Sequence, residues 1–190
     1  MPPRRMGLIG AECTGKSALA KELASELDAL VVPEYLRQFV LDHGRTPQQG
    51  EQSMILRAQE QAEAEATATA TATTLMATVI GDPAPLMTAV YSCAYFDDYS
   101  LLEPALAHAR GYDLLVWCDT DIPWLADGVQ RDGEAHRARV HSILVDIFGK
   151  NQERVPAALG LSPLLVSGDL ASRVAAVRRV WLPESPDGST

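Results

Sequence analysis

The chain has 190 residues, of which 47% are hydrophobic and 22% are charged. This composition is typical of one compact folded domain and excludes a disordered chain, a disulfide scaffold and a fibre. The sixteen basic and twenty-five acidic residues give a formal net charge of −9, which argues against a duplex nucleic-acid binder because such proteins carry a basic face.

In chain order, short apolar runs that predict strands alternate with patterns that predict helices. The predicted strands are residues 6–9, 30–32, 78–80, 114–118 and 164–166. The first predicted helix begins near residue 16. The other predicted helices cover residues 33–40, most of 47–75, 105–110, 140–148 and 174–181. We expect the long helix in 47–75 to be largely solvated and its Ala-Thr second half to be weak, because threonine is a poor helix former. Five strands separated by helices predict a three-layer α/β domain with a parallel sheet.

We expect one domain over residues 1–182, with a lid segment at about 122–139 and a disordered tail at 183–190. The three cysteines form no CxxC pair, which is typical of a reducing compartment. No apolar run approaches the ~20 residues that cross a bilayer. These features predict a cytoplasmic protein that binds neither a membrane nor nucleic acid.

The turn after the first predicted strand carries a complete phosphate-binding motif. It fits G-x-x-x-x-G-K-[ST] and lies between a strand and a helix. Its glycines let backbone N–H groups point at phosphate oxygens, at the positive end of the helix dipole. Lys16 would reach the β- and γ-phosphates, and Ser17 would ligate Mg²⁺. No Asn-Lys-x-Asp segment, which reads guanine, is present, so we expect ATP. The predicted nucleotide-binding residues are Gly10, Ala11, Glu12, Cys13, Thr14, Gly15, Lys16, Ser17 and Ala18.

Carboxylates that follow predicted strands are candidates for the magnesium shell and for proton transfer. Asp82 and Asp119 both lie at strand ends, where open α/β sheets bind ligands. The apolar pattern favours Asp119, whereas Pro83 suits a sharp exit from the strand, so both stay open. Glu34 could accept a proton from a substrate hydroxyl, with Arg37 orienting it or binding phosphate. Alternatively, these two residues form an ordinary surface ion pair.

The segment between the fourth strand and the helix at 140–148 contains proline, glycine and arginine residues. A mobile cation that closes over the developing charge helps phosphoryl transfer. We expect Arg131 to be this cation, with Arg137 as the second choice.

Four segments in this order resemble a known family. They are the phosphate-binding turn, Val-Pro-Glu-Tyr-Leu-Arg at 32–37, Gly-Asp-Pro at 81–83 followed by Met-Thr-Ala-Val-Tyr-Ser at 87–92, and Asp-Ile-Pro-Trp-Leu-Ala-Asp-Gly at 121–128. The chain resembles, over about 5–181, the NadR-type nicotinamide riboside kinase domains of NAD synthesis and related small bacterial AAA-type P-loop ATP-binding proteins.

The resemblance implies a role for each matching residue. It favours Asp82 over Asp119 as the acidic group that holds the magnesium shell. The residues that it implies for substrate binding are Glu34, Tyr35, Arg37, Trp124 and Asp127, with Arg131 beside Trp124 and Asp127 in the lid. Two departures are present: Gly81-Asp82-Pro83 stands where the family has Asp-Thr-Asp, and Gln130 delays the lid arginine by one residue.

These observations predict a P-loop kinase that transfers phosphate from ATP, with Mg²⁺, to a nucleoside-type hydroxyl; the resemblance implies nicotinamide riboside. Lys16 and Arg131 would stabilise the transition-state charge, Asp82 would hold the magnesium shell through water, and Glu34 would be the base. One alternative is a nucleoside monophosphate kinase, which needs a second phosphate-binding cluster. Another is a nucleotide-binding regulatory module with little turnover.

Overall fold

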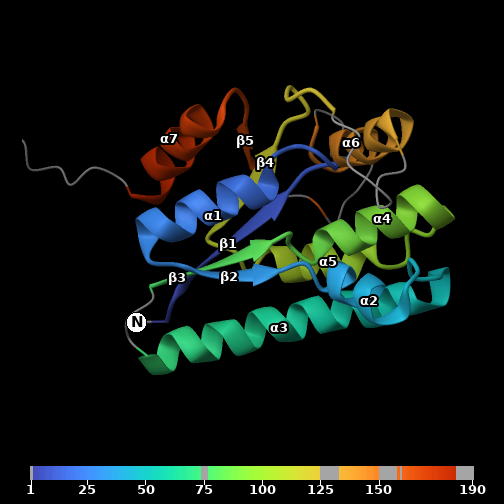
Figure 1. Cartoon of the computed structure of the whole chain (residues 1–190), viewed down its shortest axis with the longest axis horizontal. Coiled ribbons are helices and arrows are strands. Elements are labelled where there is room, and N and C mark those ends of the chain that lie inside the picture. Colours follow the sequence, from blue (N-terminus) through green and yellow to red (C-terminus); the bar gives the residue numbers. More distant parts are fainter. Residues whose placement is uncertain (1, 74–76, 125–132, 150–157, 159, 183–190) are drawn as a thin grey trace, which may run out of the picture.

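Five parallel strands form the centre of the molecule (Figure 1). The computed structural model describes residues 2–73, 77–124, 133–149, 158 and 160–182. The strands are β1 (Arg4–Ile9), β2 (Leu30–Pro33), β3 (Thr78–Asp82), β4 (Leu114–Cys118) and β5 (Leu164–Val166). They lie in the order β2-β3-β1-β4-β5, and every pair is parallel. Each corresponds to an apolar run in the sequence, and β3 and most of β1 and β4 are buried on both faces, as is usual in parallel sheets.

Helices cover both faces of this sheet. They are α1 (Lys16–Leu27), α2 (Tyr35–His43), α3 (Gln52–Thr73, after a short 3₁₀ turn at Gln49–Glu51), α4 (Leu86–Phe96), α5 (Leu102–Ala109), α6 (Glu134–Phe148) and α7 (Leu170–Trp181). α1 and α7 pack on one face, and α4, α5 and α6 pack on the other with α3 beside them (Figure 1). The three-layer α/β architecture is therefore confirmed.

The strand order brings three loops together at one edge of the sheet. β1 is central, with β3 on one side and β4 on the other. The register pairs Gly7 with Gly81 and Ile9 with Trp117, so the three strands end at nearly the same level. Ligands of open α/β sheets bind at this position, where the carboxyl ends of neighbouring strands meet.

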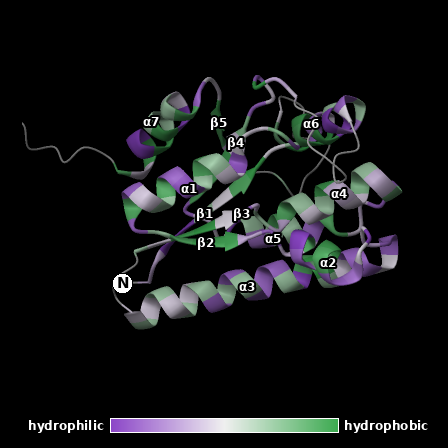
Figure 2. Cartoon of the chain, in the orientation of Figure 1, coloured by the Kyte–Doolittle hydropathy of each residue, from purple (hydrophilic) through white to green (hydrophobic). Residues whose placement is uncertain are grey.

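The long helix α3 buries one face and leaves the rest of its surface partly or fully exposed. Its buried residues recur on one face and include polar side chains: Gln52, Ile55, Leu56, Gln59, Glu63 and Ala70. Its colours in Figure 2 alternate along its length between hydrophilic and hydrophobic. The remaining sixteen of its 22 residues are partly or fully exposed, so the helix is largely solvated as expected. The sequence did not indicate that polar residues such as Gln59 and Glu63 would lie on its buried face.

The sequence pattern did not predict α4. Nine of its eleven residues are buried. A helix that is covered all round has no amphipathic stripe, so hydrophobic periodicity does not reveal it.

Two sequence predictions lie outside the described residues. They are the tail at 183–190 and the central part of the lid at 125–132, which contains Asp127 and Arg131. None of the helices in the described part of the chain has the length and apolar character of a membrane span.

Candidate active site

The turn between β1 and α1 has the backbone conformation of a phosphate-binding loop. Gly10 (φ +146°), Cys13 (φ +53°) and Gly15 (φ +78°) all have positive φ. A Cβ added at Gly10 would lie 2.7 Å from the carbonyl oxygen of Cys118 and 2.9 Å from Oγ1 of Thr14. Glycine is required at this position because it alone fits both the backbone conformation and the space.

Lys16 places a cation inside this turn. Its Nζ donates to the carbonyl oxygens of Gly10 (2.8 Å) and Ala11 (2.7 Å). Burial lowers the pKa of Lys16 from its ordinary value, while the carboxylates of Glu34 and Asp82 act in the opposite direction. The two carboxylates predicted from sequence therefore lie close enough to act on the P-loop lysine.

The structure favours Asp82 over Asp119 as the acidic group at the site. Asp82 ends β3, directly beside β1, and is 9% exposed. Its charge acts on Lys16 and on Arg37. The Asp119 carboxylate instead accepts the backbone N–H of Thr120 at 2.7 Å. Asp119 thus caps its own turn.

Glu34 lies at the end of β2, immediately before α2. Nε of Arg37 donates to its Oε2 at 3.0 Å, and the Glu34 side chain is 16% exposed against 65% for Arg37. The pKa of Arg37 is raised above its ordinary value. Burial lowers it, but the hydrogen bond to Glu34 and the nearby negative charges raise it by more. Arg37 is therefore oriented by Glu34 while its outer end faces solvent.

Tyr91 on α4 is a site residue that the sequence analysis did not single out. Its side chain is buried. Burial raises the pKa of Tyr91 well above its ordinary value, and Glu34 and Glu12 raise it further. The phenol therefore remains a hydrogen-bond donor at neutral pH. Its position came from an element that the hydrophobic pattern did not predict.

Gln59 on α3 holds the backbone on both sides of Glu34. Its Oε1 accepts the N–H of Tyr35 at 2.6 Å, and its Nε2 donates to the carbonyl oxygen of Pro33 at 3.2 Å. Gln59 is buried. One amide on a distant helix thus fixes the junction between β2 and α2, a role that the Gln-rich sequence of this helix did not indicate.

The lid residues fall into two groups. Trp124, the last described residue before the gap at 125–132, is partly buried. Arg137 was the wrong second choice for a mobile cation, because it is buried and donates to the carbonyl oxygens of Thr120 (3.0 Å) and Ile122 (2.7 Å). It holds the chain just before residues 125–132, which the sequence predicts to be part of a lid. Asp127 and Arg131 lie outside the described residues.

The absence of a side chain at Gly81 has a structural reason. A Cβ at Gly81 would lie only 2.2 Å from Oε1 of Glu63. Glu63 is itself buried and accepts hydrogen bonds from Tyr112 (2.7 Å) and Arg5 (2.9 Å). A carboxylate from α3 therefore fills the space beside the sheet that a side chain at position 81 would need.

The residues at the edge of the sheet fit ATP and Mg²⁺ in their chemistry. The positive-φ turn supplies N–H donors, Lys16 supplies a cation, and the exposed hydroxyl of Ser17 and the carboxylate of Asp82 are hard oxygen ligands. Among the described residues, no group of three or more His, Cys, Asp or Glu could hold a metal ion. In proteins generally, Mg²⁺ takes most of its ligands from substrate phosphates and water.

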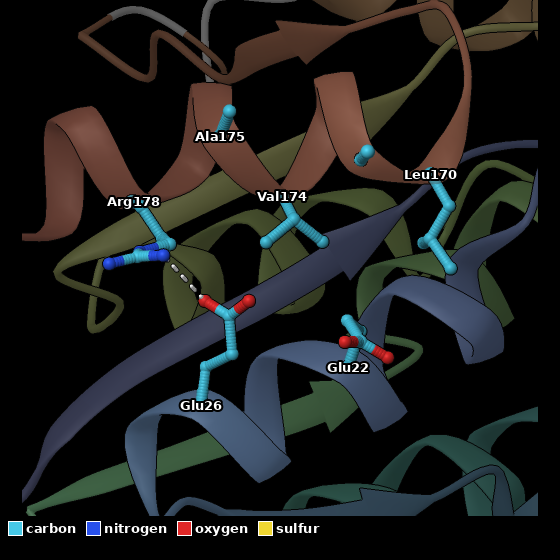
Figure 3. Close-up of a pocket in the computed structure, with 7 residues that line it drawn as sticks. Glu22, Glu26, Leu170, Val174, Ala175 and Arg178 are labelled. Atoms are coloured by element: carbon cyan, nitrogen blue, oxygen red, sulfur yellow. Dashed lines mark ion pairs between the residues drawn. The ribbon is translucent and has the colours of Figure 1, made fainter.

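A separate hollow lies between α1 and α7 (Figure 3). Its walls include Glu22, Glu26, Leu170, Val174, Ala175 and Arg178. Arg178 already pairs with Glu26 at 3.1 Å. We interpret this hollow as the outer part of the contact between the two helices, because its one cation is engaged there.

The comparisons with known proteins agree with this geometry. The model of a family described as an AAA domain matches residues 5–160. The chain belongs to this AAA domain family. No curated protein matches the chain by sequence.

Solved structures show which fold this AAA domain has. A NadR protein in complex with NR is 19% identical with a TM-score of 0.70, covering 99% of this chain and 54% of that one. A NadR protein in complex with NAD and AMP-PNP is 18% identical with a TM-score of 0.66, covering 93% and 49%. A thymidylate kinase from Candida albicans is 12% identical with a TM-score of 0.63, covering 94% and 91%.

The chain therefore has the fold of P-loop kinases, and it spans about half the length of the two NadR chains. The predicted fold class and the resemblance to NadR-type and AAA-type P-loop proteins are confirmed at the level of family and fold.

Proposed function

We propose that this AAA-domain chain is a phosphotransferase that uses ATP and Mg²⁺ to phosphorylate a nucleoside-type hydroxyl. One observation carries the proposal: β2 and β3 are parallel neighbours with Pro33 paired to Asp82, so Glu34 and Asp82 lie at adjacent strand ends, beside the turn after β1 that holds Lys16. A module that only binds nucleotide needs the cation but has no need of a second carboxylate on the acceptor side. A kinase needs both, one for the magnesium shell and one for proton transfer.

On the donor side, the backbone N–H groups of residues 10–18 would hold the phosphates. Lys16 would exchange its two backbone acceptors for β- and γ-phosphate oxygens, which bind an ammonium group more strongly because they are charged. Ser17 would ligate Mg²⁺ directly and Asp82 would hold it through water. Bound Mg²⁺ supplies charge neutralisation at the β- and γ-phosphates.

On the acceptor side, Glu34 would receive the proton of the substrate hydroxyl. The hydroxyl oxygen forms its bond to the γ-phosphorus while the bond from that phosphorus to ADP breaks. Arg37 would orient Glu34, and Tyr35, Trp124 and Asp127 would line the acceptor pocket. Arg131 would close from the lid and stabilise the charge that develops on the transferred group.

We further propose nicotinamide riboside as the first acceptor to test. Its support is the family pattern of the sequence together with the likeness to the NadR protein in complex with NR. The site also suits an acceptor that carries no phosphate group. Among the described residues, Lys16 and Arg37 are the cations next to Glu34, and Nε of Arg37 already donates to Glu34. A nucleoside monophosphate kinase would need further cations there.

Release of ADP from Mg-ATP tests the proposal when it is measured against nicotinamide riboside, nucleosides and nucleoside monophosphates. Stimulation by one nucleoside class is the expected result. Lys16→Ala should lower turnover by about 10²–10³. Lys21→Ala is the matched control, because Lys21 is an exposed lysine on the same helix. ATP binding without acceptor-dependent turnover across the whole panel would refute the kinase proposal in favour of a regulatory module.

A further inference from the structure

We propose that Arg173, on α7, is a positioning residue for the phosphate-binding turn and that it acts through the carbonyl group of Thr14. Arg173 lies 159 positions from Thr14 in the sequence, and its Nη1 donates to the Thr14 carbonyl oxygen at 2.7 Å. Its side chain is only 1% exposed. A fully buried arginine that contacts the P-loop backbone is a feature that the mechanism above does not use.

The other donors of the same guanidinium bind two further loops. Nε donates to the carbonyl oxygen of Gly168 at 2.8 Å, and Nη2 pairs with the carboxylate of Asp121. The second carboxylate oxygen of Asp121 accepts the N–H of Gly168. Arg173 therefore joins the loops that follow β1, β4 and β5, three neighbouring strands of the sheet.

The contact with Thr14 decides which way one peptide group of the turn faces. In a planar trans peptide the carbonyl and the following N–H point in opposite directions. Because Arg173 holds the Thr14 carbonyl on the side of α7, the N–H of Gly15 is directed away from α7. This N–H is one of the donors that a phosphate-binding turn must direct at its ligand.

Burial makes this arrangement rigid. A buried guanidinium must keep its partners, because an unpaired buried charge is strongly unfavourable. Arg173 has one carboxylate and two carbonyl acceptors. The planar fork satisfies all three in a single orientation, which a lysine could not do. The turn is thereby held in its binding conformation before the nucleotide arrives, which lowers the free energy lost on binding.

α7 has other attachments that do not depend on Arg173. Val174, Val177 and Trp181 are buried against the face of the sheet that α1 covers. Arg178 pairs with Glu26 of α1 at 3.1 Å, as Figure 3 shows. Both side chains of this pair are partly exposed. Arg178 therefore offers a matched control. It is an arginine on the same helix, and its ion-pair partner is Glu26 of α1 rather than a residue of the three loops.

The inference rests on the proposed use of ATP, and the experiment keeps the two apart. Binding of Mg-ATP and of magnesium tripolyphosphate to the full chain is measured by calorimetry for wild type, Arg173→Met and Arg178→Met. Folding of each variant at the working temperature is verified by circular dichroism. Tripolyphosphate reports on the turn alone, because it has no base or ribose.

We expect Arg173→Met to lower the affinity for both ligands by about tenfold or more. This is the loss that follows from one misdirected hydrogen bond to a charged group. The KM for the acceptor should stay unchanged while the KM for ATP rises. Arg178→Met should keep both affinities within about twofold of wild type, since exposed pairs contribute little.

A folded Arg173→Met variant with wild-type affinity for both ligands would overturn the inference. So would a variant that loses ATP but keeps tripolyphosphate, because the defect would then lie outside the turn. If Arg173→Met does not fold, Arg173→Lys replaces it, and unchanged tripolyphosphate affinity in that variant overturns the inference equally. A wild-type protein that binds no Mg-ATP would instead refute the proposed function.

Discussion

Removal of the Glu63 carboxylate tests whether the polar network under the sheet holds the fold together. Glu63 is 1% exposed. Its carboxylate accepts hydrogen bonds from the Tyr112 hydroxyl (2.7 Å) and from Nη2 of Arg5 (2.9 Å), and it also lies 3.1 Å from Nε2 of His108. Glu63→Ala leaves the Arg5 cation without this partner and the Tyr112 hydroxyl without an acceptor. Burial, together with Glu63, raises the pKa of Tyr112 well above its ordinary value, so the phenol is a donor at neutral pH.

The size of the loss follows from these exposures. Breaking a buried ion pair by removing one partner costs about 3–5 kcal/mol. The Arg5 side chain remains 23% exposed, so water recovers part of this loss, while the stranded Tyr112 hydroxyl adds about 1–3 kcal/mol. We expect Glu63→Ala to lower the free energy of unfolding by about 3–4 kcal/mol, a large share of the ~5–15 kcal/mol of an ordinary domain.

Urea denaturation at pH 7, followed by circular dichroism, measures this change. The slope of the free energy of unfolding against urea concentration should equal that of wild type, because the surface exposed on unfolding is nearly the same. The control is Glu60→Ala, which removes a carboxylate on the same helix that is 30% exposed and 3.7 Å from His108. It should change the free energy of unfolding by no more than about 0.5 kcal/mol. A loss below about 1 kcal/mol in Glu63→Ala would contradict the assigned role of the network.

Three further predictions concern the turn, the acceptor side and the surface. Gly10→Ala should abolish measurable Mg-ATP binding in calorimetry, because its Cβ would lie 2.7 Å from a backbone oxygen; Gly50→Ala, where nothing lies within 4 Å, should bind normally, and equal binding by both variants would contradict the steric argument. Gln59→Leu should lower kcat about tenfold or more without changing the KM for ATP, since a misplaced reacting group loses rate rather than donor affinity; an unchanged kcat would remove the amide from the mechanism. The hydrogen bond from Arg45 lowers the pKa of Glu51 to about 2, so this carboxylate stabilises the fold above its unfolded pKa and loses that contribution as pH falls toward 2. An NMR titration should show the low midpoint, and Arg45→Ala should return it toward the ordinary value; a midpoint that does not move would exclude Arg45 as the cause.

The candidate site divides between residues that the sequence could indicate and residues that it could not. Glu34 and Asp82 were candidates because each lies at the end of a predicted strand, and the ends of parallel strands meet at one edge of the sheet. The apolar pattern alone favoured Asp119 over Asp82, and the family resemblance reversed that choice. Gln59 and Arg173 were not found, because each lies on a helix far along the chain and acts on the backbone of a loop. A hydrogen bond to a distant carbonyl leaves no periodicity or spacing that a pattern could reveal.

The same division applies to the fold. Local chemistry determined the five strands and the phosphate-binding turn: continuous apolar runs must be buried, and glycine alone accepts the conformation at Gly10. Tertiary packing decided what local chemistry left open. α4 is enclosed on all sides and so lost its amphipathic signal, and Glu63 became an interior partner of Arg5 although its type is usually exposed. The free energy of a polar side chain depends on whether partners surround it, and only the folded chain supplies those partners.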